Sequence, residues 1–120
     1  MKIAVSSTGN SPDAAVDPRF GRAAYFIIYD TQTDQFVAID NVQNLQAAQG
    51  AGVQAAQTVA RQKVDVAISG NFGPKAFATL NAAGIKTALW AGGTVKDAIE
   101  QAKSGRLQFA TRANVEGHWV

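Results

Sequence analysis

The second half of the chain alternates short, mainly apolar segments with amphipathic ones, and glycine marks each change. Val64–Ser69 and Ile85–Trp90 have the length and composition of buried strands. Helical periodicity follows each of them. Pro74 opens one helix that Gly84 ends, and Thr94–Asp97 has the pattern of a capping box at the start of another. Strands that alternate with helices predict an α/β domain with parallel central strands.

The first half of the chain predicts a further strand, a hairpin and one more helix. Lys2–Ser6 is a short apolar strand, and Ala24–Tyr29 and Gln35–Asp40 form a hairpin. A helix starts at Gly50–Gly52 and runs to about Lys63. We therefore expect a five-stranded mixed sheet in the order 3-2-1-4-5 with three helices, a three-layer α/β fold of the ribonuclease H-like type.

Length and composition favour one globular domain. The chain has 120 residues, of which 47% are hydrophobic and 17% charged, enough for one core and too apolar for a disordered chain. We expect a single domain over residues 1–105 and a C-terminal tail over residues 106–120. Neither a signal peptide nor a membrane span is visible, so the expected location is the cytoplasm.

The charged and sulfur-containing residues exclude several classes of function. The eleven Lys and Arg residues are scattered along the chain, which argues against a nucleic-acid footprint. The chain has no cysteine, so disulfides, thiolate catalysis and cysteine-ligated metal clusters are excluded. A small anionic ligand remains compatible with this composition.

Glycine-rich loops predict a ligand site at one end of the sheet. Ser7–Asn10, Gly70–Gly73 and Ala91–Gly93 follow the carboxyl ends of the expected parallel strands, which is where open α/β sheets bind ligands. Two of these loops lead into helix N-termini, and Gly50–Gly52 offers a third; free amides at such termini favour anions. Glycine also serves in ordinary turns, so the indication comes from the combination of loops.

Arg19 and Arg22 flank Phe20 and Gly21 in a compact cationic segment that suits a bulky anion. The alternative, that Arg19 pairs with Asp17 or Asp13 and pins the loop, stays open at this point. The candidate ligand-binding residues are Ser7, Thr8, Asn10, Arg19, Phe20, Gly21, Arg22, Gly50, Gly52, Gly70, Asn71, Phe72, Gly73, Gly92 and Gly93.

Catalytic motifs are weak or missing. Gly50–Ala55 matches the dinucleotide pattern G-x-G-x-x-A, but a polar segment precedes it where the motif requires a strand. Asp65 lies at the entry end of its strand, so the clustered carboxylates of a two-metal nuclease are lacking. His118 is the only histidine, lies three residues from the end of the sequence and has no acid–nucleophile constellation around it; a metal contact by His118 stays open. The sequence indicates a binding protein and not an enzyme.

Several segments together resemble a known family. The blocks DPRFGRAAYF, GAGVQAAQ and ISGNFGPKAFATLNAAGIK are similar, in that order, to conserved blocks of the nitrogenase iron–molybdenum cofactor-binding accessory family. The similarity spans about residues 2 to 103 and is greatest to the small stand-alone members. It implies a ribonuclease H-like fold without nuclease activity and non-covalent binding of a metal–sulfur cluster.

For the small members, the resemblance implies a molybdenum–copper sulfide; for the cofactor-carrying members, it implies an iron–molybdenum-type cluster. The molybdenum–copper sulfide fits a chain without cysteine better, because its copper is satisfied by sulfide. Two tetrathiomolybdate dianions on one Cu(I) form a trianion, for which the protein supplies amides, cations and an apolar wall. A regulatory or scaffolding module that binds a protein partner or a nucleotide is the alternative function.

Overall fold

The computed structural model describes residues 1–41, 51–90 and 92–110. The elements are β1 (Lys2–Ser7), β2 (Tyr25–Asp30), β3 (Gln35–Asp40), α1 (Ala51–Ala60), β4 (Val66–Ser69), α2 (Pro74–Ala82), β5 (Lys86–Leu89), α3 (Val95–Lys103) and β6 (Gln108–Phe109).

The strands form one mixed sheet in the order β3-β2-β1-β4-β5-β6. β1 lies in the middle, antiparallel to β2 and parallel to β4, with Ala4 opposite Ile28 on one side and Ala67 on the other. β5 continues the parallel part. The predicted order 3-2-1-4-5 is present, but the prediction of five strands is wrong. Gln108–Phe109 adds a sixth strand, antiparallel to β5.

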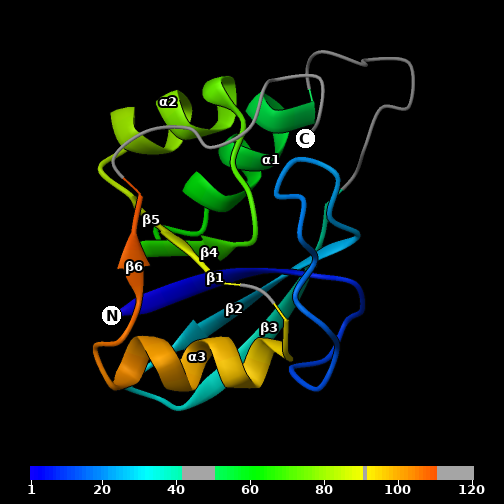
Figure 1. Ribbon diagram of the computed structural model, residues 1–120, viewed down its shortest axis with the longest axis vertical. Coiled ribbons are helices and arrows are strands. Elements are labelled where there is room, and N and C mark those ends of the chain that lie inside the picture. Colours follow the sequence, from blue (N-terminus) through cyan, green and yellow to red (C-terminus); the bar gives the residue numbers. More distant parts are fainter. Residues whose placement is uncertain (42–50, 91, 111–120) are drawn as a thin grey trace.

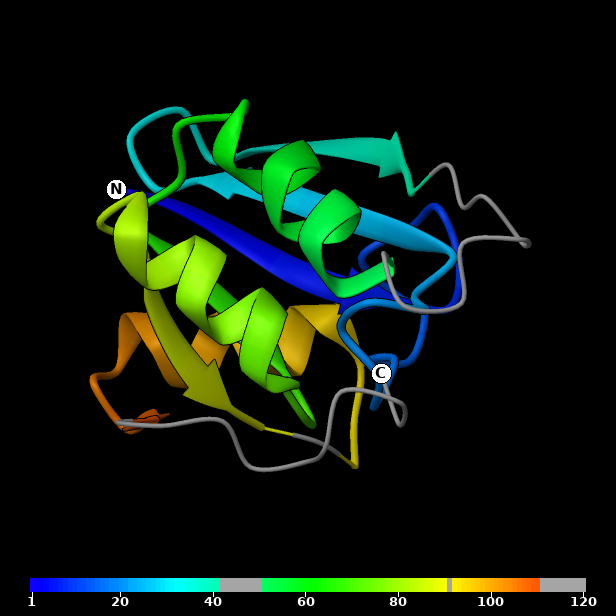
Figure 2. The same cartoon turned by 90° about the horizontal axis from the view of Figure 1, so that it is seen from above.

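Helices cover both faces of the sheet. α1 and α2 lie on one face and α3 lies on the other (Figures 1 and 2). Residues of β1 and β2 alternate between the two cores that result, because successive side chains of a strand point to opposite faces. Ala4 and Phe26 pack in the core beneath α1 and α2, whereas Ile3 and Ile27 pack in the core beneath α3.

The local signals that define the helices are confirmed. Thr94 caps α3, with the reciprocal hydrogen bonds of a capping box between Thr94 and Asp97. Pro74 is in the first turn of α2, where its missing amide costs nothing. α1 ends at Ala60, earlier than the expected Lys63, and Lys63 has a positive φ of 56° that stops the helix.

The part of the chain beyond residue 105 begins with β6. Ala110 N–H donates to the Thr87 carbonyl at 2.8 Å and extends the pairing with β5 by one hydrogen bond. Residues 111–120, including His118, lie outside the described residues. Within the described ranges, no helix is both long and apolar enough to cross a membrane.

Candidate functional site

The long loop between β1 and β2 runs across the carboxyl ends of the parallel strands. In its first part, Ser7 bridges Val16 and Ala15 bridges Thr94, so this part lies beside the start of α3. In its second part, Arg19 bridges Asn71. The loop therefore connects the segments that follow β4 and β5, as expected for loops at one end of a sheet.

Two buried serine hydroxyls hold this loop to the sheet. Ser6 Oγ donates to the Asp17 carbonyl at 2.7 Å, and the Ser6 and Ser69 hydroxyl oxygens are 2.8 Å apart. Ser69 Oγ is also 3.3 Å from the Asp17 carbonyl. Both serines are 0% exposed at the ends of β1 and β4. This shared network fixes Asp17, and with it the start of the cationic segment.

A close glycine contact brings the same segment to α1. A Cβ atom on Gly21 would lie 3.0 Å from the Gly52 Cα and 3.1 Å from its nitrogen. The Asn41 side-chain amide donates to the carbonyls of Gly21 and Ala23, at 3.2 and 2.8 Å. Only glycine permits this approach, so Gly21 and Gly52 place Arg22 near the first turn of α1.

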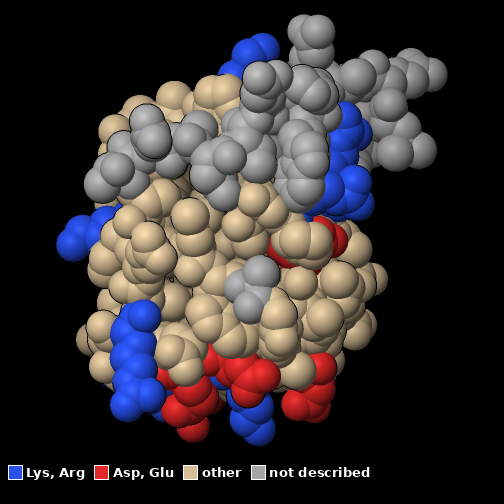
Figure 3. Space-filling view, in the orientation of Figure 1, with Lys and Arg blue, Asp and Glu red and all other residues tan. Residues whose placement is uncertain are grey.

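Arg19 is exposed. It lies in the turn that follows Asp17 and that bridges Asn71 of the segment after β4. Its backbone amide donates to Asp17 Oδ1 at 3.0 Å, and the Asn71 side-chain amide donates to the Pro18 carbonyl at 2.9 Å. Among the described residues, no ion pair involves the Arg19 guanidinium. Asp17 thus shapes the turn through the backbone, and the guanidinium stays available to a ligand. Figure 3 shows basic side chains at the upper right of the molecule, with acidic atoms next to them, and both acidic and basic side chains along the lower edge, where α3 lies.

The N-termini of α2 and α3 differ in what their amides contact. Gly73 at the start of α2 provides no side-chain cap, so the amides of the first turn have no capping side chain as acceptor. At α3, the Thr94 amide already donates to Asp97 Oδ2 at 3.0 Å. The Asp97 carboxylate therefore occupies the place that an anion would take at α3.

The structure divides the expected site residues into two groups. Arg19, Gly21, Arg22, Gly52, Asn71 and Gly73 meet between the starts of α1 and α2, whereas Ser7, Thr8, Asn10, Gly92 and Gly93 belong to the part of the chain beside α3. Gly70 follows β4 directly and leads into the first group. Gly50 lies outside the described residues. The first group combines the exposed Arg19 with an uncapped helix start.

Phe20 and Phe72 are placed differently from what the sequence suggested. Both were expected to form an apolar wall for the ligand, but both are 0% exposed. Their ring centroids are 5.0 Å apart, and Phe20 is equally close to Phe26. The two rings therefore anchor the loop in the core, because burying large aromatic surfaces outweighs presenting them to a ligand.

Sequence reasoning missed the residues that fix the loop from below. Ser6, Ser69 and Asn41 contact only backbone or one another in the hydrogen bonds described above. The available signal was a serine at the end of each of two apolar strands, where a buried hydroxyl needs a partner.

Protein ligands for a metal are scarce at this end. The chain has no cysteine, and the described residues contain no group of three or more His, Asp or Glu side chains that could hold a metal ion.

Comparison with known proteins identifies the family. Residues 1–105 match the family model described as dinitrogenase iron–molybdenum cofactor. The chain belongs to this family. The match confirms the resemblance seen in the sequence. No curated protein sequence matches the chain.

Several solved structures share the fold of this chain. The apo form of the orange protein from Desulfovibrio gigas is 40% identical, with a TM-score of 0.86 over 95% of this chain and 96% of that one. A putative NifB protein from Thermotoga is 34% identical, with a TM-score of 0.80 over 97% and 98%. A putative dinitrogenase from Methanocaldococcus jannaschii is 16% identical with a TM-score of 0.67 over 93% and 96%, which shows the fold alone.

Proposed function

We propose that this chain is a non-catalytic, cytoplasmic carrier of an anionic metal–sulfur cluster, specifically a molybdenum–copper sulfide. The cluster binds non-covalently between the starts of α1 and α2. The observation that carries the proposal is that Arg19 is exposed, forms no ion pair with any described residue, and bridges Asn71 just before the start of α2, which has no side-chain cap. The family of the chain and its similarity to the orange protein support a cluster as cargo.

Charge and hydrogen bonding favour an anion at this place. Arg19 is exposed and Arg22 is half-buried, and the two are separated by the turn that the contact of Gly21 with Gly52 fixes. A guanidinium and helix amides stabilise an anion together, because the amides carry the positive end of the helix dipole. The rigid turn lowers the entropy cost of binding, since the cationic groups are positioned beforehand.

The choice of cluster follows from the ligand types that the described residues lack. An iron–molybdenum-type cluster with open metal positions needs a thiolate or imidazole, and the described part of the chain has neither. A molybdenum–copper sulfide carries a complete set of sulfide ligands. Its sulfur atoms accept hydrogen bonds from the amides and guanidiniums of the site.

Reconstitution tests the proposal. Adding tetrathiomolybdate and Cu(I) to the purified protein should give a visible chromophore that stays with the protein through gel filtration at a fixed stoichiometry. The His118→Ala variant should keep this chromophore, because the proposed site needs no protein ligand to the metal. A chromophore that separates from the protein, or that is lost only in His118→Ala, would refute binding by cations and amides.

A further inference from the structure

β3 is an open edge of the sheet. It pairs with β2 along its whole length, and no other described strand lies beside it. Figure 2 shows β3 at the margin of the sheet. An unpaired strand of this length is a template for pairing with another strand.

The hydrogen-bond pattern shows which backbone groups of β3 point outward. The Thr31 amide donates to Met1, so the odd-numbered residues of β2 pair with β1; the Asn41 amide donates to Ala24, so the even-numbered ones pair with β3. Antiparallel pairing alternates along a strand. The amides and carbonyls of Phe36, Ala38 and Asp40 therefore face away from β2.

The side chains of β3 do not protect this edge. Phe36 is 37% exposed and Val37 is 56% exposed, and no charged residue or proline interrupts β3 between Gln35 and Asp40. Edge strands usually carry such interruptions, which prevent pairing. Val37 and Ile39 point to the face of α1, because they lie opposite Ile28 and Phe26 in the register.

We propose that β3 pairs antiparallel with β3 of a second copy of this chain, about a two-fold axis at Ala38. In this register, the outward groups of Phe36 bond those of Asp40 of the second copy, and Ala38 bonds itself. Val37 then lies opposite Ile39 of the second copy, on the face of α1. Such apolar cross-strand pairs stabilise a sheet, and an isologous contact of this kind closes as a dimer.

The length of β3 selects this register over the two neighbouring ones. A shift of the second strand by two residues in either direction keeps the hydrogen-bond pattern, but it leaves Asp40 or Phe36 without a partner within β3 of the second copy. Asp34, which would lie opposite Asp40 in one of these shifts, is outside β3 and has a positive φ of 58°. The axis at Ala38 pairs all three outward-facing residues, Phe36, Ala38 and Asp40, within β3.

Cysteine cross-linking tests the register, because the natural chain has no cysteine. Val37→Cys and Ile39→Cys are prepared separately, checked for folding by circular dichroism, and mixed in equal amounts under mild oxidation. The opposed residues form a non-hydrogen-bonded pair with Cα atoms about 4.5 Å apart, within the range for a disulfide. A disulfide-linked dimer should form rapidly in the mixture and at least tenfold more slowly with either variant alone. Ala78→Cys, on the exposed surface of α2, mixed with Val37→Cys measures random collision.

Sedimentation equilibrium of the unsubstituted protein completes the test. The apparent mass should rise with concentration from 12.6 kDa toward twice that value, and Ala38→Lys should stay monomeric because two lysines would meet at the axis. Rapid cross-linking of Val37→Cys or of Ile39→Cys with itself would overturn the register in favour of a shifted one. A constant monomer mass up to millimolar concentration, with cross-linking no faster than the Ala78→Cys control, would overturn the dimer.

Discussion

Ser6 and Ser69, at the ends of neighbouring central strands, hydrogen bond to each other with their hydroxyl oxygens 2.8 Å apart. Both hydroxyls also lie within hydrogen-bonding distance of the Asp17 carbonyl. The long loop is thus joined to the sheet at its midpoint by groups that no solvent reaches. Because buried hydrogen bonds are costly to leave unmade, this junction determines how firmly the cationic turn is held.

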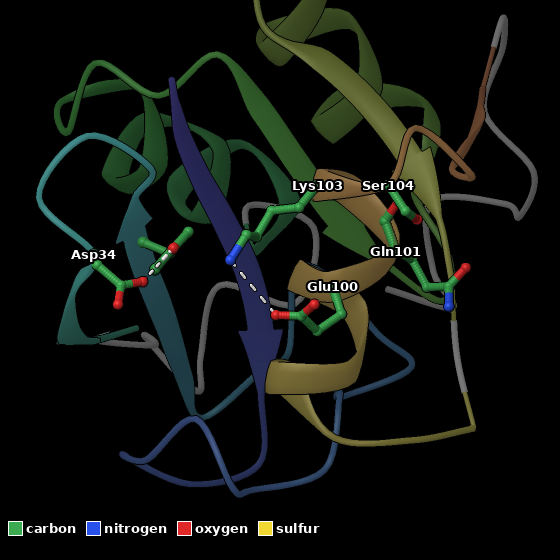
Figure 4. Close-up of polar contacts among 6 residues, drawn as sticks. Asp34, Glu100, Gln101, Lys103 and Ser104 are labelled. Atoms are coloured by element: carbon green, nitrogen blue, oxygen red, sulfur yellow. Dashed lines mark hydrogen bonds and ion pairs between the residues drawn. The ribbon is translucent and has the colours of Figure 1, made fainter.

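Replacing Ser6 by alanine should lower the free energy of unfolding by about 1–3 kcal/mol, since the Asp17 carbonyl loses its shorter hydrogen bond. Chemical denaturation measures this loss. Ser69→Ala should cost less, and the double variant should cost less than the sum, because the two hydroxyls share one acceptor. Ser104→Ala is the control: Ser104 is exposed and its hydroxyl donates to the Gln101 carbonyl in α3; Figure 4 shows both residues. Its effect should stay within about 0.5 kcal/mol. Equal losses in Ser6→Ala and Ser104→Ala would contradict this interpretation.

Gly21→Ala should separate the cationic turn from α1. The added Cβ would meet backbone atoms of Gly52 at 3.0 and 3.1 Å, and backbone cannot rotate away as a side chain can. We expect a loss of about 1–3 kcal/mol in stability, typical of overpacking, together with weaker cluster binding. Ala24→Gly is a useful comparison, because Ala24 is exposed beside the same loop. A Gly21→Ala protein with unchanged stability and affinity would show that this contact does not position the site.

Tyr29 should make stability fall at alkaline pH. Its hydroxyl donates to Asp34, and this hydrogen bond is the main cause that raises the pKa of Tyr29 above its ordinary value. Lys103 lies with its ammonium 5.7 Å from the centre of the Tyr29 ring and pairs with Glu100 at 3.6 Å (Figure 4). Because the folded state holds the phenol proton more tightly, this stabilisation is complete below the unfolded pKa of about 10. It is lost as pH rises through the folded pKa.

Absorbance of tyrosinate in the Tyr25→Phe variant, which leaves Tyr29 as the only tyrosine, follows that titration. The midpoint should lie above that of a free tyrosine and should move down in Asp34→Asn. A midpoint at or below the ordinary value would show that the hydrogen bond to Asp34 does not govern Tyr29.

Much of the fold could be predicted because its strands and helices carry strong local signals. The apolar centre of β1, the proline that opens α2 and the capping box of α3 each specify an element from neighbouring residues. β6 could not be predicted in this way. Gln108–Phe109 is too short to show a period, and it becomes a strand only because the edge of β5 offers partners.

The site was predicted less completely because the sequence gives the type of each side chain but not how deeply it is buried. Arg19 and Asn71 were recognised by type, and the structure brings them together. Phe20 was assigned to the ligand on the same grounds, yet the core buries it. Gly93 was a candidate because it precedes a helix N-terminus, but there the Thr94 amide already donates to the Asp97 carboxylate. Which polar and apolar groups remain at the surface depends on tertiary packing, and a local sequence pattern does not report tertiary packing.

Titration of Arg19→Ala with copper–tetrathiomolybdate, followed by visible absorbance, tests the proposed site. Loss of one charge-assisted contact of about 1.5–3 kcal/mol should raise the dissociation constant roughly ten- to a hundredfold. Arg61→Ala removes an equally exposed arginine just beyond the opposite end of α1 and should leave the dissociation constant within about twofold of the unsubstituted protein. If Arg19→Ala binds the cluster as tightly as Arg61→Ala does, the cluster does not bind at the Arg19 turn.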